Sequence, residues 1–509
     1  MKNIVRRNLP ILLMLIVSFS CSDLDTELYS ELTPDSFFQT DDQFVAALGT
    51  AYTSLYTYSG DPWSAQELST ETSAAPAKFG PWDDGGIWAR LHRHEWEVTL
   101  FLFDVSWNMG FGGISTCNRL IEQLRELAPP EQAEQFVSEL RALRAYYYFL
   151  MIDMFGDVPL ITSFSGAEAN PPRTARAEVF NYLVDELNEV IPELSDEVSS
   201  ATYGRVNKWG ALALLTKLYL NAEVYSGTPQ WALAASTAQE IINGGKFSLE
   251  VNYFDNFAVE NSASRENIFV IPYEAGNANG FNLHMRTLHP LNAATYNFST
   301  GPWNGYTALQ EFYDSFTDDD VRKEMFIVGQ QYTATGEPIH DPNGAIEIDS
   351  EGNSDPDGTP LIFTPEINEL IPKAFSQSGA RIGKYEFEKG IQLDMDNDFP
   401  LLRYGDVLLM RAEALWRLNP GDAETVELIR QVRERAGLGT IDPLTEDELY
   451  HEIQREVAFE GHSRTNMIRF DRFTDAWWEK SASDPNKNLF PIPANQLNGN
   501  PNLVQNPGY

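Results

Sequence analysis

Two stretches rich in glycine and proline, residues 78–90 and 299–306, place tryptophan beside polar side chains. A flat indole or phenol ring covers the apolar C–H face of a sugar at little entropic cost, and neighbouring carboxylates or amides can hydrogen-bond its hydroxyl groups. These stretches and the nearby Trp63 therefore predict a sugar-binding site. Its candidate residues are Trp82, Trp303, Trp88, Trp63, Asp83, Asp84, Asn304 and Tyr306. For each ring the alternative is packing in the core, and for the two aspartates it is the stabilisation of a turn.

Catalytic and metal-binding patterns are weaker. A glycosidase needs two carboxylates at a set separation, and among 74 Asp and Glu residues some pair can always be proposed. No Walker loop, dinucleotide fingerprint, nucleophile elbow or HExxH motif occurs. We expect no cofactor and no metal centre, except that one acidic loop would be able to hold a structural Ca²⁺ loosely; a solvated loop is the favoured alternative. Its residues are Asp349, Glu351, Asn353, Asp355 and Asp357.

Composition narrows the class of protein. The chain has 509 residues, of which 43% are hydrophobic and 12% aromatic, as in a globular protein with a large core. Its formal net charge of −38 repels nucleic acid and anionic polymers at long range. We therefore expect no nucleic-acid partner, and we favour a neutral ligand.

The N-terminus has the pattern of a secretion signal. Lys2, Arg6 and Arg7 precede an apolar run at residues 9–19, which is too short to span a bilayer, and Cys21 follows directly. The arrangement resembles a bacterial lipoprotein signal, which predicts a signal peptide at 1–20, lipidation of Cys21, and a tether with an extended arm at 21–40. The alternative is an ordinary secretory signal in which Cys21 has no role.

Helical periodicity marks most of the remaining chain. In residues 139–161 apolar side chains recur every three or four positions until Gly156, and Pro159 prevents the helix from resuming. Cys117 lies in a similar pattern and is expected to be a small buried side chain. Residues 59–95 have no period, and in residues 244–400 the helical period fades around a short strand at 266–272. Further helices are predicted at 41–58, 96–127, 173–194, 206–225, 231–243, 404–418, 423–436 and 446–459, and another is predicted to begin at Thr307.

Several segments together resemble the SusD/RagB family of outer-membrane nutrient-binding lipoproteins. They are residues 139–161, 397–415, 456–462, 468–473 and 489–509. The resemblance implies a mainly α, SusD-like fold in one domain, 41–509. Its scaffold of tetratricopeptide-like helix pairs would comprise residues 41–243 and 401–480. A loop-rich subdomain with a few short strands would occupy 244–400, and an extended tail 481–509.

The same resemblance implies a function. A SusD-like protein is anchored by lipid to the outer membrane of a Gram-negative bacterium, faces outward, captures oligosaccharide without catalysis, and passes it to a TonB-dependent SusC-like transporter. The stretch around Trp82 and Trp88 is similar to that of members associated with β-glucans such as laminarin. The alternatives are a surface glycoside hydrolase, or a transporter lid or adhesin with a non-glycan ligand such as a peptide. Whether the two aromatic stretches meet in space is left open by the sequence.

Overall fold

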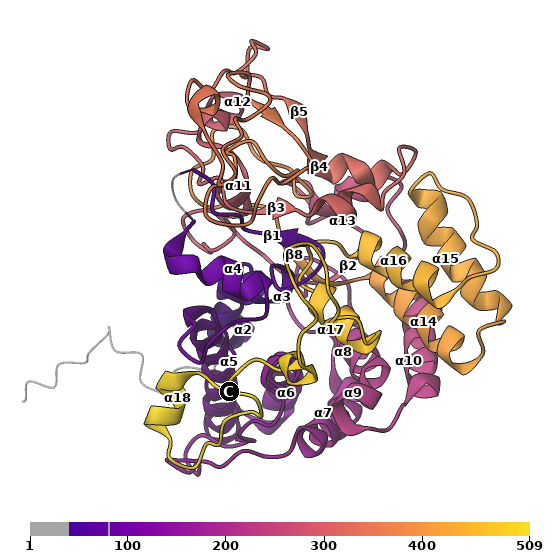
Figure 1. Cartoon of the computed structure of the whole chain (residues 1–509). Coiled ribbons are helices and arrows are strands. Elements are labelled where there is room, and N and C mark those ends of the chain that lie inside the picture. The colour runs from indigo at the N-terminus through magenta and orange to yellow at the C-terminus, as the bar shows by residue number, and fades with distance from the viewer. Residues whose placement is uncertain (1–39, 80–81) are drawn as a thin grey trace, which may run out of the picture.

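The computed structural model describes residues 40–79 and 82–509, and most of this chain is helical (Figure 1). The predicted signal peptide, Cys21 and residues 21–39 of the predicted arm lie outside the described residues. Among the helices of the described part, none is both long and apolar enough to cross a membrane. The mainly α prediction is confirmed.

Two long helices, α5 (Phe101–Leu127) and α6 (Pro130–Phe155), form an antiparallel hairpin near the N-terminal end of the fold. Glycines let the two helices approach closely. A Cβ at Gly110 would lie 2.4 Å from the Met151 side chain, and one at Gly113 would lie 2.3 Å from the ring of Tyr147. As predicted, α6 ends at Gly156, whose positive φ of 74° is easily adopted only by glycine.

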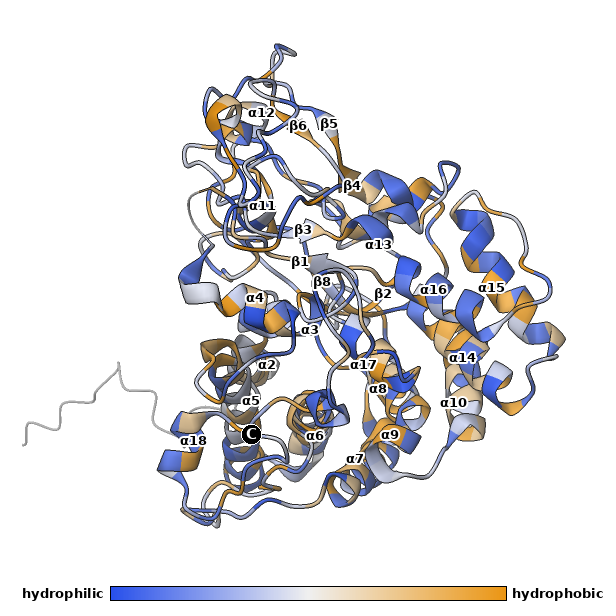
Figure 2. Ribbon diagram, in the orientation of Figure 1, coloured by the Kyte–Doolittle hydropathy of each residue, from blue (hydrophilic) through white to orange (hydrophobic). Residues whose placement is uncertain are grey.

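The rest of the scaffold continues this helical packing. Helix α8 packs against α7 and α10, α10 packs against α14, and α14 against α15. All residues of α8 after its first are buried, and α8 is accordingly largely apolar in Figure 2. The bounds are α2 (Asp41–Tyr52), α7 (Arg176–Val190), α8 (Lys208–Leu220), α9 (Ala222–Ser226), α10 (Trp231–Gly244), α14 (Tyr404–Leu418), α15 (Ala423–Arg435), α16 (Glu446–Glu456), α17 (Ser463–Arg469) and α18 (Ala494–Gly499).

Most of the chain between α10 and α14 lies in the upper part of Figure 1, and most of its residues belong to loops. The strands of the described chain form two-stranded antiparallel sheets: β1 with β3, β2 with β8, β4 with β7, and β5 with β6. Their bounds are β1 (Ser73–Ala74), β2 (Asn267–Ile271), β3 (Thr307–Ala308), β4 (Phe326–Ile327), β5 (Gly329–Gln330), β6 (Ile362–Phe363), β7 (Arg381–Ile382) and β8 (Phe399–Arg403). Short helices α11 (Leu283–Thr287), α12 (Ala293–Tyr296) and α13 (Gln310–Asp314) lie between them.

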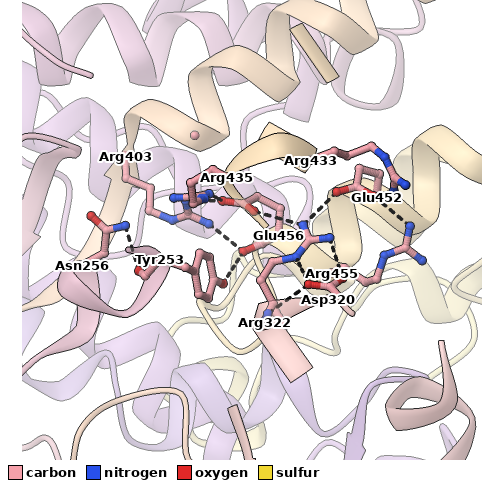
Figure 3. Close-up of polar contacts among 12 residues, drawn as sticks. Tyr253, Asn256, Asp320, Arg322, Arg403, Arg433, Arg435, Glu452, Arg455 and Glu456 are labelled. Carbon is pink, nitrogen blue, oxygen red and sulfur yellow. Dashed lines mark hydrogen bonds and ion pairs between the residues drawn. The ribbon is translucent and has the colours of Figure 1, made fainter. Parts of the chain in front are cut away.

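A buried network of charges joins this upper part to the C-terminal helices (Figure 3). The Arg322 guanidinium contacts Glu452 at 2.8 Å and Glu456 at 3.1 Å, both on α16. Arg403, at the end of β8, contacts Glu456 at 2.7 Å, and Arg435 of α15 also pairs with Glu456. All of these side chains are almost wholly withdrawn from solvent, so each charge depends on its partners.

The structure differs from the sequence expectation in two places. Residues 59–95, predicted to be aperiodic, contain the helices α3 (Asp61–Glu67) and α4 (Ile87–His92). Both span fewer than two and a half turns, which is too short to produce a recognisable period. A helix was also predicted to begin at Thr307, but that residue belongs to β3 and the helix α13 begins three residues later.

Candidate functional site

The two aromatic stretches meet, and the backbone explains how. Strand β1 pairs with β3 so that Ala74 lies opposite Thr307. Beyond this pairing the two segments stay side by side. The Nζ of Lys78 donates a hydrogen bond to the Gly305 carbonyl at 3.0 Å, and the Nε1 of Trp82 donates one to the Trp303 carbonyl at 2.6 Å.

A hollow of about 550 Å³ opens beside this junction. Its apolar lining includes Phe79, Leu291, Trp303 and Ile346. The Trp303 ring is partly exposed, and Phe79 and Ile346 keep 37% and 75% of their surface in contact with solvent. Exposed aromatic and aliphatic surface at the rim of a concave site is what an apolar sugar face requires.

Polar groups line the same hollow. His289 Nε2 lies 3.4 Å from the Asp341 carboxylate, and this hydrogen bond holds the pKa of Asp341 below its ordinary value. Burial lowers the pKa of His289, so its ring is neutral at pH 7. Glu347 accepts hydrogen bonds from the Ser376 backbone N–H at 2.8 Å and its hydroxyl at 2.5 Å, yet burial raises the pKa of this carboxyl. Both ring nitrogens of His289 are engaged, because its Nδ1 also accepts a hydrogen bond from the Leu291 backbone N–H at 3.2 Å. These buried polar groups therefore form a wall of the hollow that is hydrogen-bonded within the protein.

Three of the predicted site residues lie in the core, which corrects the expectation that they form a sugar platform. Trp63, Trp88 and Tyr306 expose 2%, 5% and 0% of their surface. The rings of Trp63 and Tyr306 stack on one another with centroids 5.8 Å apart, and Trp88 meets the Tyr306 ring edge-on at 5.7 Å. The alternative of packing in the core therefore applies to these three side chains, because none has an exposed ring face on which a sugar could stack.

The other predicted residues occupy the surface or the wall of the hollow. Trp82 is partly buried, Asp83 and Asp84 are exposed, and Asp84 accepts a hydrogen bond from the Trp88 indole at 2.8 Å. Asn304 lines the hollow but is 94% buried, and its amide donates to the Ser376 carbonyl at 3.0 Å.

Sequence reasoning missed part of the lining. Phe79 belongs to one of the aromatic stretches, but its residue type and position carry no signal of its exposure. Asp341 and Ile346 precede the acidic residues that were considered only for Ca²⁺. Among these residues Asp349 already accepts hydrogen bonds from the backbone N–H groups of Glu351 and Asn353. Within the described ranges, no three His, Cys, Asp or Glu side chains gather to hold a metal ion.

Comparison with known proteins covers nearly the whole chain. A model described as the SusD family matches residues 392–509, and a model described as "Starch-binding associating with outer membrane" matches residues 24–220. The starch-binding protein SusD of Bacteroides thetaiotaomicron is 27% identical over 451 residues, which are 82% of this chain and 79% of that protein. SusD-like protein P2 of Formosa agariphila is 24% identical, over 98% of each chain.

Solved structures share the architecture. A laminarin-binding SusD-like protein superposes with a TM-score of 0.73 at 24% identity, covering 92% of this chain and 100% of the other. Surface glycan-binding protein A from Bacteroides thetaiotaomicron, in complex with laminarihexaose, superposes with a TM-score of 0.72 at 22% identity, covering 92% and 99%. These similarities establish the fold and confirm the predicted fold class.

Proposed function

We propose that this chain is a SusD-family, glycan-binding lipoprotein of the bacterial cell surface and not an enzyme. Lipid on Cys21 would anchor it to the outer membrane, with residues 21–40 as the tether. The remaining chain, 41–509, would act as one SusD-like unit that captures oligosaccharide and delivers it to a TonB-dependent SusC-like transporter.

The observation that carries this proposal is the partly exposed Trp303 ring at the rim of a 550 Å³ hollow, with Phe79 exposed beside it. An aromatic pair of this kind supplies apolar area without the entropic cost of a flexible side chain. Asn343 lines the same hollow and is exposed, so its side-chain amide is placed to hydrogen-bond sugar hydroxyls.

A neutral glycan, with laminarin-type β-glucan as the first candidate, fits the site best. One similar solved structure is that of a laminarin-binding SusD-like protein, and another is that of a surface glycan-binding protein in complex with laminarihexaose. The net charge of −38 and the ionised Asp341 in the hollow both disfavour a polyanionic chain such as alginate.

Affinity electrophoresis tests this function. The protein from Ser22 to Tyr509 is run in native gels that contain laminarin, starch, xylan, levan or alginate, beside Trp303→Ala and Phe79→Ala. The matched control is Phe164→Ala, which removes a phenylalanine that is 48% exposed and does not line the hollow. We expect one neutral glycan to retard the wild type and the control, and to retard both hollow variants less. Retardation by alginate alone, or equal retardation of all four proteins, would contradict the proposal.

A glycoside hydrolase is the second candidate, because two carboxylates in the hollow have pKa values shifted in opposite directions, Asp341 downward and Glu347 upward. Such a pair is what general acid–base catalysis requires. Both groups, however, are already hydrogen-bonded to neighbouring side chains or backbone. We therefore favour binding without turnover. Release of reducing sugar from laminarin by the wild type, abolished in Glu347→Gln, would establish the hydrolase instead.

A further inference from the structure

We propose that Trp82 is a positioning residue: it holds Trp303 in the orientation that receives the glycan and does not itself stack on a sugar. This inference rests on the function proposed above. It assigns different roles to Trp82 and Trp303, which the sequence alone predicts to be sugar platforms of the same kind.

Trp82 reaches Trp303 through the backbone. Its indole N–H donates to the Trp303 carbonyl at 2.6 Å, and Lys78, from the same segment, donates to the Gly305 carbonyl at 3.0 Å. The two carbonyls flank Asn304, whose backbone is left-handed, with φ of 58°. Lys78 and Trp82 thus hold the backbone on both sides of Asn304, next to Trp303.

The backbone N–H groups of Trp303 and Asn304 are held by α11 and the residue after it. The Trp303 backbone N–H donates to the Met285 carbonyl at 2.6 Å, and that of Asn304 donates to the Leu288 carbonyl at 2.9 Å. With Trp82 on its carbonyl and Met285 on its N–H, the Trp303 peptide groups have little freedom to rotate. A ring fixed before binding loses less entropy when a ligand arrives.

The Trp82 ring is partly buried and packs against protein on several sides. It packs against Trp88 and Tyr306, each with centroids 5.2 Å away, and it lies on Gly305, where an added Cβ would be 2.3 Å from the indole. Gly305 is therefore required for this close approach. The φ of Trp82 is 83°, a region that a bulky side chain rarely adopts and that surrounding contacts must enforce. These contacts fix the Trp82 side chain within the protein, whereas Trp303 lines the hollow.

Fluorine NMR of protein labelled with 5-fluorotryptophan can separate the two roles. Each resonance is assigned by replacing one tryptophan with phenylalanine. Trp82→Phe keeps most of the ring packing but loses the N–H donor, so the Trp303 resonance should move or broaden in the ligand-free protein. Trp231→Phe, which removes a partly buried tryptophan on α10, is the matched control and should leave the Trp303 resonance unchanged.

Titration with laminarihexaose completes the test. Its binding should shift the Trp303 resonance more than that of Trp82, and Trp82→Phe should weaken binding by about 2- to 10-fold, the range expected for one hydrogen bond. If Trp82→Phe does not fold, Gly305→Ala takes its place. The added methyl group displaces the Trp82 ring, so the Trp303 resonance should move in the same way.

Two results would overturn the positioning role: a Trp303 resonance unaffected by Trp82→Phe, or a ligand shift larger at Trp82 than at Trp303. Failure of the proposed function looks different. In that case laminarihexaose shifts neither resonance, while the ligand-free comparison of wild type and Trp82→Phe still decides whether Trp82 holds Trp303 in position.

Discussion

Replacing Glu452 by glutamine should destabilise the protein strongly, although the side chain keeps its shape. Glu452 is fully buried and contacts Arg322 at 2.8 Å, Arg433 at 2.7 Å and Arg455 at 2.9 Å. Burial opposes its ionisation, but these guanidinium groups, Arg322 foremost, prevail and lower its pKa to about 2. A decrease from the ordinary value of 4.5 to about 2 corresponds to about 3 kcal/mol. Breaking a buried ion pair typically costs about 3–5 kcal/mol.

The pH dependence follows from the same shift. Because the folded pKa of Glu452 lies below its unfolded value, its stabilisation is fully present above the unfolded value and is lost as the pH falls through the folded one. The difference in unfolding free energy between wild type and Glu452→Gln should therefore be largest near pH 7 and should shrink between about pH 4.5 and about pH 2.

Urea titrations followed by tryptophan fluorescence at pH 7 and pH 3 measure this difference. Glu427→Gln is the matched control, since the same substitution on α15 removes an exposed pair with Arg430, 2.6 Å away, and should have a much smaller effect. A loss below about 1 kcal/mol for Glu452→Gln, or one that is the same at both pH values, would refute the reasoning on buried pairs.

Three further predictions concern single buried groups. Burial raises the pKa of Cys117 to about 12, so its thiol should not react with a disulfide reagent at pH 8 in the native protein and should react fully in urea. Burial raises the pKa of Asp398 from 3.8 to about 6, so above pH 6 the folded protein carries this buried carboxylate in its ionised form at a cost in stability; Asp398→Asn should raise the unfolding free energy at pH 8 by about 3 kcal/mol and change it little at pH 4, as urea titrations will show. Trp63→Phe removes a buried hydrogen bond of 3.0 Å to the Phe459 carbonyl; it should lower stability by about 1–3 kcal/mol in urea and leave retardation by glycan unchanged, whereas reduced retardation would return Trp63 to the site.

The sequence predicts the scaffold because long helices repeat their pattern many times. The α6 helix carries seven turns of apolar periodicity and a glycine that stops it, so both its existence and its end were predictable. Helices such as α4, with six residues, cover less than two turns and leave no pattern to recognise. The irregular region between α10 and α14 depends on contacts between distant residues, which a local pattern does not encode.

The candidate site shows the same limit. Trp303 was predicted and lies at the hollow, while Trp88 and Tyr306, of similar type and in the same two stretches, are buried. Residue type and local composition are alike for all three. Their exposure is decided by how the stretches pack on each other, because Trp88 and Tyr306 cover one another and Trp303 is left at the edge. Asp341 is distant in sequence from both aromatic stretches, and only the tertiary fold brings it to the hollow.

The central claim is that the hollow at Trp303 binds a glycan, and calorimetric titration of laminarihexaose into wild type, Trp303→Ala and Phe164→Ala tests it most directly. Losing the stacked ring should weaken binding by about tenfold or more, which corresponds to about 1.4 kcal/mol, while the Phe164 variant should bind as the wild type does. Equal affinity of all three proteins would contradict the claim and place the glycan elsewhere on the surface.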